Sequence, residues 1–139
     1  MASIESYEVN APRTIKGLEG GTQSFEVGDL VKFSAGYVVI ATSNAISGIA
    51  RRDATGTSGS TIEVELIDPN GVYSARVSDS TTHAQTLVGT IMDFTFTAGE
   101  HVLADGTTDA YVVGLDPRDA IGATNGRVLF RFKVSNYGA

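Results

Sequence analysis

The stretch EVGDLVKFSAGYVVIATSNAISGIARRDA, residues 26–54, decides the fold of this chain. Val31 and Phe33 fall on one side of its first extended run and Lys32 falls on the other, which is the period of two expected of a half-buried strand. A tight turn follows at the letters SAG, because Gly36 accepts the positive φ that other residues resist. These residues predict the first half of a β-hairpin.

The second half of the hairpin is the run YVVIA, residues 37–41. Five consecutive apolar residues with two valines and an isoleucine predict a strand that is covered on both faces. Residues 45–50 are apolar again, and Ser47-Gly48 inside that run suits a bulge or a corner. We therefore expect residues 26–54 to form a core hairpin and a third strand, onto which the rest of the chain is laid.

Two further runs alternate between apolar and polar residues. Residues 61–67, TIEVELI, and residues 72–78, VYSARVS, are separated by the strong turn sequence DPNG. This arrangement predicts an antiparallel hairpin of the two runs. The side chains predicted to point inward are Ile62, Val64, Leu66, Tyr73, Ala75 and Val77.

The C-terminal half continues with short extended runs. A break in the β pattern at residues 79–91 predicts one short helical turn, ended by Gly89, and residues 116–120 predict a second single turn. Asp105-Gly106 predicts a tight hairpin between its flanking strands. The expected strands are residues 92–97, 101–104, 111–115 and 126–134, with Phe94 and Phe96 on one face and with Val128, Phe130, Phe132 and Val134 inward.

Composition agrees with an all-β chain. The 139 residues include sixteen glycines, three prolines and no cysteine, so disulfides and thiolate metal sites are excluded. About ten short strands at spacings of roughly 8 to 12 residues, without a long helix, predict a compact antiparallel β-barrel or sandwich. We expect one such domain over residues 25–139, because this length is typical of a single core.

Residues 1–24 have a weaker burial pattern than the rest. Pro12 interrupts a brief alternation, and Gly17, Gly20 and Gly21 weaken the strand pattern of the residues after it. Such a segment is either a frayed terminus or an extended arm that becomes ordered against a partner. As an arm, it would contact the partner through apolar side chains and two cations. The candidate contact residues are Ile4, Tyr7, Val9, Arg13, Ile15, Lys16 and Leu18.

Charge and hydropathy exclude two classes of partner. A net charge of −6 argues against a surface that follows nucleic-acid phosphates. The longest apolar run is far shorter than the roughly 20 residues of a membrane span, and the first residues lack the pattern of a signal peptide. We expect neither nucleic acid nor a membrane as a partner.

No catalytic or metal-binding pattern is found, so we expect no enzyme and no cofactor. His83 and His101 are far apart in sequence and predict surface positions rather than a metal fork. The acidic run at residues 105–109 lacks the spacing of a calcium loop and is interpreted as a hairpin tip. Glu63 and Glu65 lie on one predicted face, roughly 7 Å apart by strand rise, and are interpreted as a solvated pair.

The chain resembles the head decoration, or cement, proteins of tailed bacteriophages. The resemblance covers most of residues 25–134 and is carried by GDLVK at 28–32, GIA at 48–50, LDPRDA at 115–120 and GRVLFRF at 126–132. Proteins of this family are small all-β domains of jelly-roll or β-tulip type that bind the outer face of the assembled major capsid protein. The resemblance implies a structural virion protein on the outer capsid surface, made in the host cytoplasm. It also implies a homodimer or homotrimer on a capsid symmetry axis that staples neighbouring subunits.

Two other classes of function remain open from the sequence. A carbohydrate-binding or adhesin β-domain would need exposed aromatic residues, for which Tyr7, Tyr37 and Tyr137 are available. A small hydrolase would have to use the pair Glu63 and Glu65.

Overall fold

The computed structural model describes residues 4–10, 12–42 and 46–133, and within them the chain is all-β, as predicted. Eleven strands and one 3₁₀ turn occur in these residues. The elements are β1 (Ile4–Glu8), β2 (Thr14–Glu19), β3 (Leu30–Ser34), β4 (Tyr37–Ile40), β5 (Gly48–Ala50), β6 (Thr61–Leu66), β7 (Val72–Arg76), η1 (Gln85–Leu87), β8 (Ile91–Thr97), β9 (Glu100–Asp105), β10 (Ala110–Leu115) and β11 (Arg127–Phe132).

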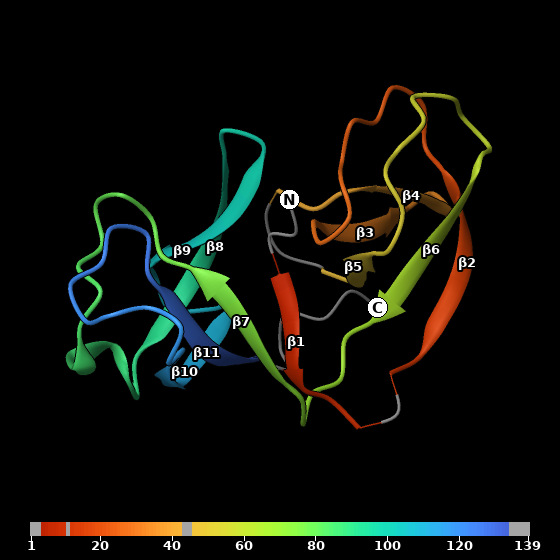
Figure 1. The fold of residues 1–139 in the computed structure, drawn as a ribbon. Helices are drawn as coiled ribbons and strands as arrows, with labels where there is room; N and C mark the ends of the chain where they lie inside the picture. The colour runs from red at the N-terminus through yellow and green to blue at the C-terminus, as the bar shows by residue number, and fades with distance from the viewer. Residues whose placement is uncertain (1–3, 11, 43–45, 134–139) are drawn as a thin grey trace.

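The strands form two sheets that lie side by side (Figure 1). One is a six-stranded sheet in the order β1-β7-β11-β10-β8-β9. The other is a closed barrel in the order β2-β4-β3-β5-β6, in which β2 and β4 are a parallel pair. Since β1 belongs to the first sheet and β2 to the second, the whole barrel is inserted in the chain between two neighbouring strands, β1 and β7.

The expectation that residues 1–24 form an arm outside the β-domain is corrected by this topology. β1 pairs antiparallel with β7, and its Ile4 side chain is fully buried. β2 pairs along its length with β6 and also with β4, so it closes the barrel. Pro12 lies between β1 and β2, and Gly21 lies in the turn after β2, whereas Gly17 lies within β2 itself. The boundary expected near residue 24 separates no structural units.

Two predicted hairpins are wrong in their pairing, although their strands exist. β6 and β7 belong to different sheets, and the DPNG turn between them is the crossing from the barrel to the six-stranded sheet. This crossing is held by Tyr73, whose hydroxyl accepts a 3.0 Å hydrogen bond from the Asp68 backbone N–H. β9 and β10 likewise flank β8 on opposite sides instead of pairing with each other. Alternation identifies the buried face of a strand but carries no information about its neighbour.

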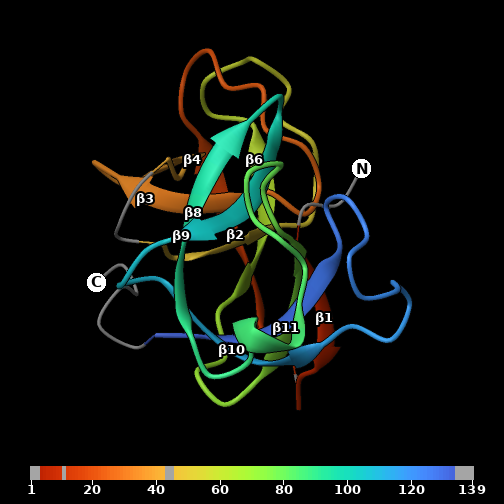
Figure 2. The ribbon, with the colours of Figure 1, turned by 90° about the vertical axis from the view of Figure 1, so that its left-hand side faces the viewer.

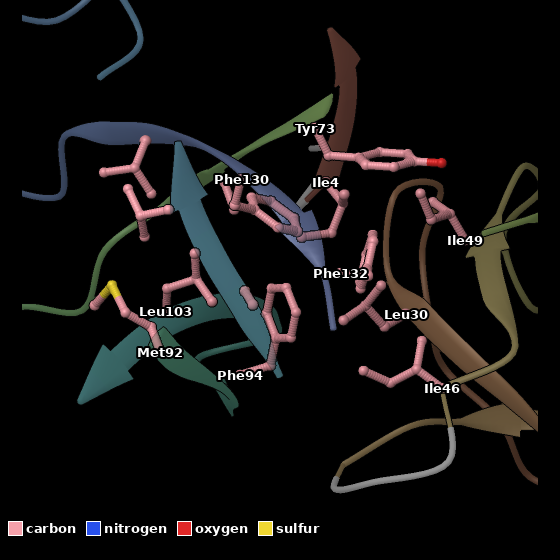
Figure 3. Packing of buried hydrophobic residues seen from close by; sticks show 14 of the residues in the cluster. Ile4, Leu30, Ile46, Ile49, Tyr73, Met92, Phe94, Leu103, Phe130 and Phe132 are labelled. Atoms are coloured by element: carbon pink, nitrogen blue, oxygen red, sulfur yellow. The ribbon is translucent and has the colours of Figure 1, made fainter. Parts of the chain in front are cut away.

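The larger hydrophobic core lies between the barrel and the six-stranded sheet, as Figure 3 shows. From the sheet, Tyr73 and three phenylalanines pack as edge-to-face or tilted rings, with Tyr73 and Phe132 centroids 5.0 Å apart. From the barrel, Leu30, Ile46 and Ile49 pack against them. A smaller cluster fills the barrel itself, made of Phe25, Val31, Val38, Ala50, Ile62 and Val64.

The hairpin of β3 and β4 forms as predicted, with positive φ at Ala35 and Gly36 in its turn. Its second strand is covered on one face, not on both. Val38 is fully buried inside the barrel, whereas the preceding Tyr37 is 42% exposed on the outside. A barrel of five strands has one interior, so the outward half of this apolar run remains on the surface.

Of the two helical turns predicted from the sequence, only the first contains a helical element. The break at residues 79–91 contains only the 3₁₀ turn η1, and residues 116–120 form a turn within a longer loop that ends at Gly126. We refer to residues 116–126 as the covering loop, because its Asp116 and Arg118 lie over the outer face of β7 and β1, where they contact Ser74 and Glu5.

Candidate functional site

The strongest candidate for a functional surface is the outer face of β2, β4 and β3, which we call the β2–β4 surface. Leu18 and Tyr37 are direct partners in the parallel pair and are 48% and 42% exposed. Val39 lies next to them on the same outward face of β4. Exposed apolar side chains gathered on neighbouring strands are typical of surfaces that contact another molecule.

Two lysines border the apolar side chains of the β2–β4 surface. Lys16 precedes Leu18 by two positions on β2 and is exposed, and Lys32 is the cross-strand partner of Val39. Neither lysine has an ion-pair partner within the described residues, although Glu63 is the cross-strand neighbour of Lys16. In a protein of net charge −6, this surface combines apolar side chains with two cations.

Gly20 keeps the β2–β4 surface flat at the end of β2. A Cβ atom at this glycine would lie 2.7 Å from a methyl group of Val39 and 3.6 Å from Cβ of Tyr37. Since no side chain fits there, the aromatic ring and the valine stay accessible from outside.

The structure separates the seven predicted contact residues into groups. Ile4 is fully buried and Val9 packs partly against the larger core, so neither is available to a partner. Tyr7 is exposed on β1, and Arg13 is exposed just before β2. Lys16 and Leu18 belong to the β2–β4 surface, whereas Ile15 points to the opposite side of β2, as the cross-strand partner of buried Val64.

Three members of the β2–β4 surface, Tyr37, Val39 and Lys32, are not among the contact residues predicted from the sequence. The apolar run predicts that Tyr37 and Val39 lie in a strand covered on both faces, and Tyr37 is predicted to be exposed only if the protein binds carbohydrate. Lys32 is predicted only as the polar side of its strand. The position of Lys32 was the available signal, because a lysine opposite Val39 places that face of β4 toward solvent.

Buried carboxylates in this structure hold loops in place. Glu19 is fully buried and accepts hydrogen bonds from the backbone N–H groups of Thr55 and Gly56 and from the Thr55 hydroxyl. Burial alone would raise the pKa of Glu19, but these hydrogen bonds outweigh it and lower the pKa below its ordinary value. Asp93 binds three backbone N–H groups of residues 107–109 in the same manner.

The covering loop is held by two arginine–carboxylate pairs. The Arg118 guanidinium hydrogen-bonds to the buried Asp116 and holds the pKa of that carboxyl well below its usual range. Hydrogen bonds from Arg127 lower the pKa of Asp119 to about 2. These acids stay ionised and paired, so none has the protonation behaviour of a general acid or base.

The two glutamates of β6 differ in how deeply they are buried. Glu63 is exposed, as expected, but Glu65 is buried and accepts hydrogen bonds from Arg51 at 2.7 and 2.9 Å and from Ser6 at 3.1 Å. The expectation that both are solvated is therefore wrong for Glu65. Since Ser6 belongs to β1, Glu65 joins the barrel to the six-stranded sheet.

We expect the two glutamates to differ when each is replaced by glutamine. Glu65→Gln leaves Arg51 with a neutral partner in a largely buried position and should lower the free energy of unfolding by about 2 kcal/mol. Glu63→Gln should change it by no more than about 0.5 kcal/mol, because the side chain is exposed. Urea denaturation of both variants measures the difference, and equal stability would contradict the buried role of Glu65.

Both histidines are buried, which corrects their predicted surface positions. Each is only 1% exposed, and the ring nitrogens of both lie within hydrogen-bond distance of backbone groups. His83 lies against the covering loop and His101 lies between the two sheets. The described residues contain no group of three or more His, Cys, Asp or Glu side chains that could hold a metal ion.

A groove of about 730 Å³ lies between the β8–β9 hairpin and the loops near residues 78 and 125. Its lining is rich in hydroxyl groups and includes the ion-paired Arg76 and Glu100, whose Nε and Oε1 atoms are 3.8 Å apart. None of the described side chains that line it is aromatic, and the exposed Tyr7 and Tyr37 lie elsewhere. Tyr137 is outside the described residues.

No family model matches the chain, and no curated protein or solved structure is significantly similar to it. Among the described residues, no helix has the length and apolar character required to cross a membrane. The functional interpretation therefore depends on the surface of the molecule and on the sequence resemblance.

Proposed function

We propose that the protein is a structural component of a tailed-bacteriophage head. It binds the outer surface of the capsid and staples neighbouring major capsid protein subunits as a homodimer or homotrimer. The β2–β4 surface is the main contact with the capsid. The observation that carries this proposal is the exposed cross-strand pair Leu18 and Tyr37 beside Lys16 and Lys32.

The chemistry of the β2–β4 surface supports a protein partner with acidic groups. A central aromatic and aliphatic cluster bordered by charges is the usual organisation of a protein–protein interface. The lysines would face carboxylates of the partner and would increase the rate of encounter at low salt. Each subunit of the oligomer would contact its own site on the capsid lattice. Once one subunit is bound, the others are held at a high effective concentration near their sites, so modest affinities combine into strong retention.

The remaining polar groups support a binding role. The buried Glu19 and Asp116 and the half-buried Asp119 are hydrogen-bonded to loops or to arginines, and the buried histidines contact backbone groups. A protein that reinforces a lattice needs a rigid body and a complementary face, and it needs no reactive group. The resemblance of residues 25–134 to phage head decoration proteins favours a phage capsid as the lattice that is reinforced.

Leu18→Asp is expected to weaken binding to capsids at least about tenfold, which corresponds to about 1.4 kcal/mol. The charge enters the centre of the β2–β4 surface, while an outward side chain leaves the barrel interior unchanged. Binding of purified protein to capsids that lack it, measured as bound copies per particle over a concentration series, tests this expectation. Thermal unfolding of the variant verifies that the fold is retained.

Ile121→Asp is the matched control for Leu18→Asp. Ile121 is 66% exposed, and its covering loop lies at the end of the molecule away from the barrel (Figure 1). It should bind capsids as the unmodified protein does. Loss of binding by Ile121→Asp with normal binding by Leu18→Asp would move the interface to the covering loop, and failure of the unmodified protein to bind any capsid would refute the proposed function.

A further inference from the structure

Two asparagines of the chain are followed by glycine, Asn70 in the DPNG turn and Asn125 near the end of the covering loop. Asparagine is a chemically labile residue, and a following glycine increases its lability. The backbone nitrogen of the following residue can attack the side-chain carbonyl carbon Cγ, and glycine has no side chain to block the approach. The structure places the two asparagines in different surroundings, which separates them as reaction sites.

Asn70 is exposed, and its side-chain amide forms no hydrogen bond with another of the described residues. Its backbone N–H donates to Oδ1 of Asp68 at 3.0 Å, and the Gly71 N–H donates to the Asp68 carbonyl oxygen at 3.0 Å. These hydrogen bonds close a four-residue turn between β6 and β7, which lies at the lower edge of the molecule in Figure 2. Local opening of the turn frees the Gly71 nitrogen, and the Asn70 amide can then rotate toward it.

Asn125 is restrained on both sides of the bond that would react. Its side-chain amide donates to the carbonyl oxygen of Val77 at 2.9 Å and to Oδ1 of Asp79 at 2.7 Å. The following Gly126 is buried against the His83 ring, where a Cβ atom would lie 2.5 Å from Cγ of the imidazole. For Asn125 to react, both side-chain hydrogen bonds would have to break and the glycine would have to move away from the ring. These contacts therefore protect Asn125.

We propose that Asn70 is a site of spontaneous deamidation. The Gly71 nitrogen loses its proton to a base in the solvent and attacks Cγ of Asn70, and a succinimide ring closes as the side-chain nitrogen leaves as ammonia. Water then opens the ring. Attack of water at the side-chain carbonyl gives aspartate, whereas attack at the main-chain carbonyl gives isoaspartate, in which the main chain runs through Cβ and Cγ. Either product consumes one water, releases one ammonia and leaves a new carboxylate at this position.

Isoaspartate lengthens the connection between the barrel and the six-stranded sheet by one main-chain carbon. The turn has little room for it, because a Cβ atom at Gly71 would lie 3.0 Å from a methyl group of Val9 and 3.2 Å from the Tyr73 ring. The extra atom therefore displaces Gly71 or the hydrogen bond between the Tyr73 hydroxyl and Asp68. The new carboxylate also enters a hollow of about 690 Å³ that Glu8 and Asp68 already line. Both changes should destabilise the crossing between the sheets.

Peptide mapping of the aged protein tests the site. The purified full chain is incubated at mildly alkaline pH and cleaved with trypsin, which places Asn70 in the peptide 53–76 and Asn125 in the peptide 119–127. Mass spectrometry follows the replacement of NH by O in each peptide. We expect Asn70 to convert at least about tenfold faster than Asn125, which has two side-chain hydrogen bonds to break. In urea the two rates should become similar. Conversion of Asn125 as fast as Asn70 in the folded protein, or an intact Asn70 there under conditions that convert the unfolded chain, overturns the proposal.

Thermal unfolding of fresh and aged protein tests the effect on the crossing. Asn70→Gln is the matched control, because it keeps an exposed amide but would have to close a larger ring. After the same incubation, the unmodified protein should melt at a lower temperature in proportion to its isoaspartate content, whereas Asn70→Gln should melt as it did when fresh. Equal losses in both proteins would refute the effect of the lengthened turn. Neither measurement involves a capsid, so a failure here is distinct from a failure of the proposed function.

Discussion

Deletion of residues 1–22 is expected to prevent folding of the whole protein. The deletion removes β1, with its fully buried Ile4, from the edge of the six-stranded sheet, and removes β2 from the barrel. Without β2, the backbone groups of β4 and β6 that it bonds are left open, and the barrel cannot close. The loss should exceed the roughly 5 to 15 kcal/mol by which domains of this size are stable.

Circular dichroism and a thermal melt of the truncated protein measure this loss. No cooperative transition should remain, whereas deletion of residues 1–3, which leaves every described strand in place, should retain one. A truncated protein that melts near the temperature of the unmodified protein would show that residues 4–22 are dispensable, and would restore the interpretation of this segment as an arm.

Val64→Asp is expected to have the next largest effect. Val64 is fully buried among Val31, Val38 and Ile62 inside the barrel. An aspartate there is a charge without a partner in an apolar space, which should cost about 4 kcal/mol or more in the free energy of unfolding. We expect the variant to be unfolded or to melt far below the unmodified protein.

Val113→Asp is the control for Val64→Asp, because it makes the same substitution at a position that is 37% exposed. Its stability should change by less than about 1 kcal/mol. Chemical denaturation of both variants gives the comparison. Equal denaturation midpoints for Val64→Asp and the unmodified protein would show that β6 has the opposite register, with Glu63 and Glu65 facing the barrel interior.

Local patterns predicted the elements of this fold well and their neighbours poorly. The inward positions of Tyr73, Ala75 and Val77 followed correctly from alternation, since each is buried. The partner of their strand did not follow, because the DPNG turn is equally compatible with a hairpin and with a change of sheet. Pairing was settled by long-range packing, for which a single sequence contains no local signal.

Only part of the candidate site could be predicted from the sequence, for a related reason. Lys16 and Leu18 were selected because their segment looked weakly patterned, and they do lie on the exposed face of β2. Their neighbours Tyr37 and Val39 come from the most apolar stretch of the chain, which indicated an interior position. A closed barrel gives such a strand one buried face and one free face, and closure depends on strands distant in sequence.

Insertion of the barrel between β1 and β7 determines the order in which the protein can fold during synthesis. β1 leaves the ribosome before the strands of the barrel, but its partner begins only at Val72. Every strand of the barrel, from Thr14 to Leu66, has been made before that point. The barrel can therefore close while β1, which precedes it in the chain, remains unpaired. β1 docks only after β7 emerges, so a strand translated before the whole barrel finds its place after the barrel strands.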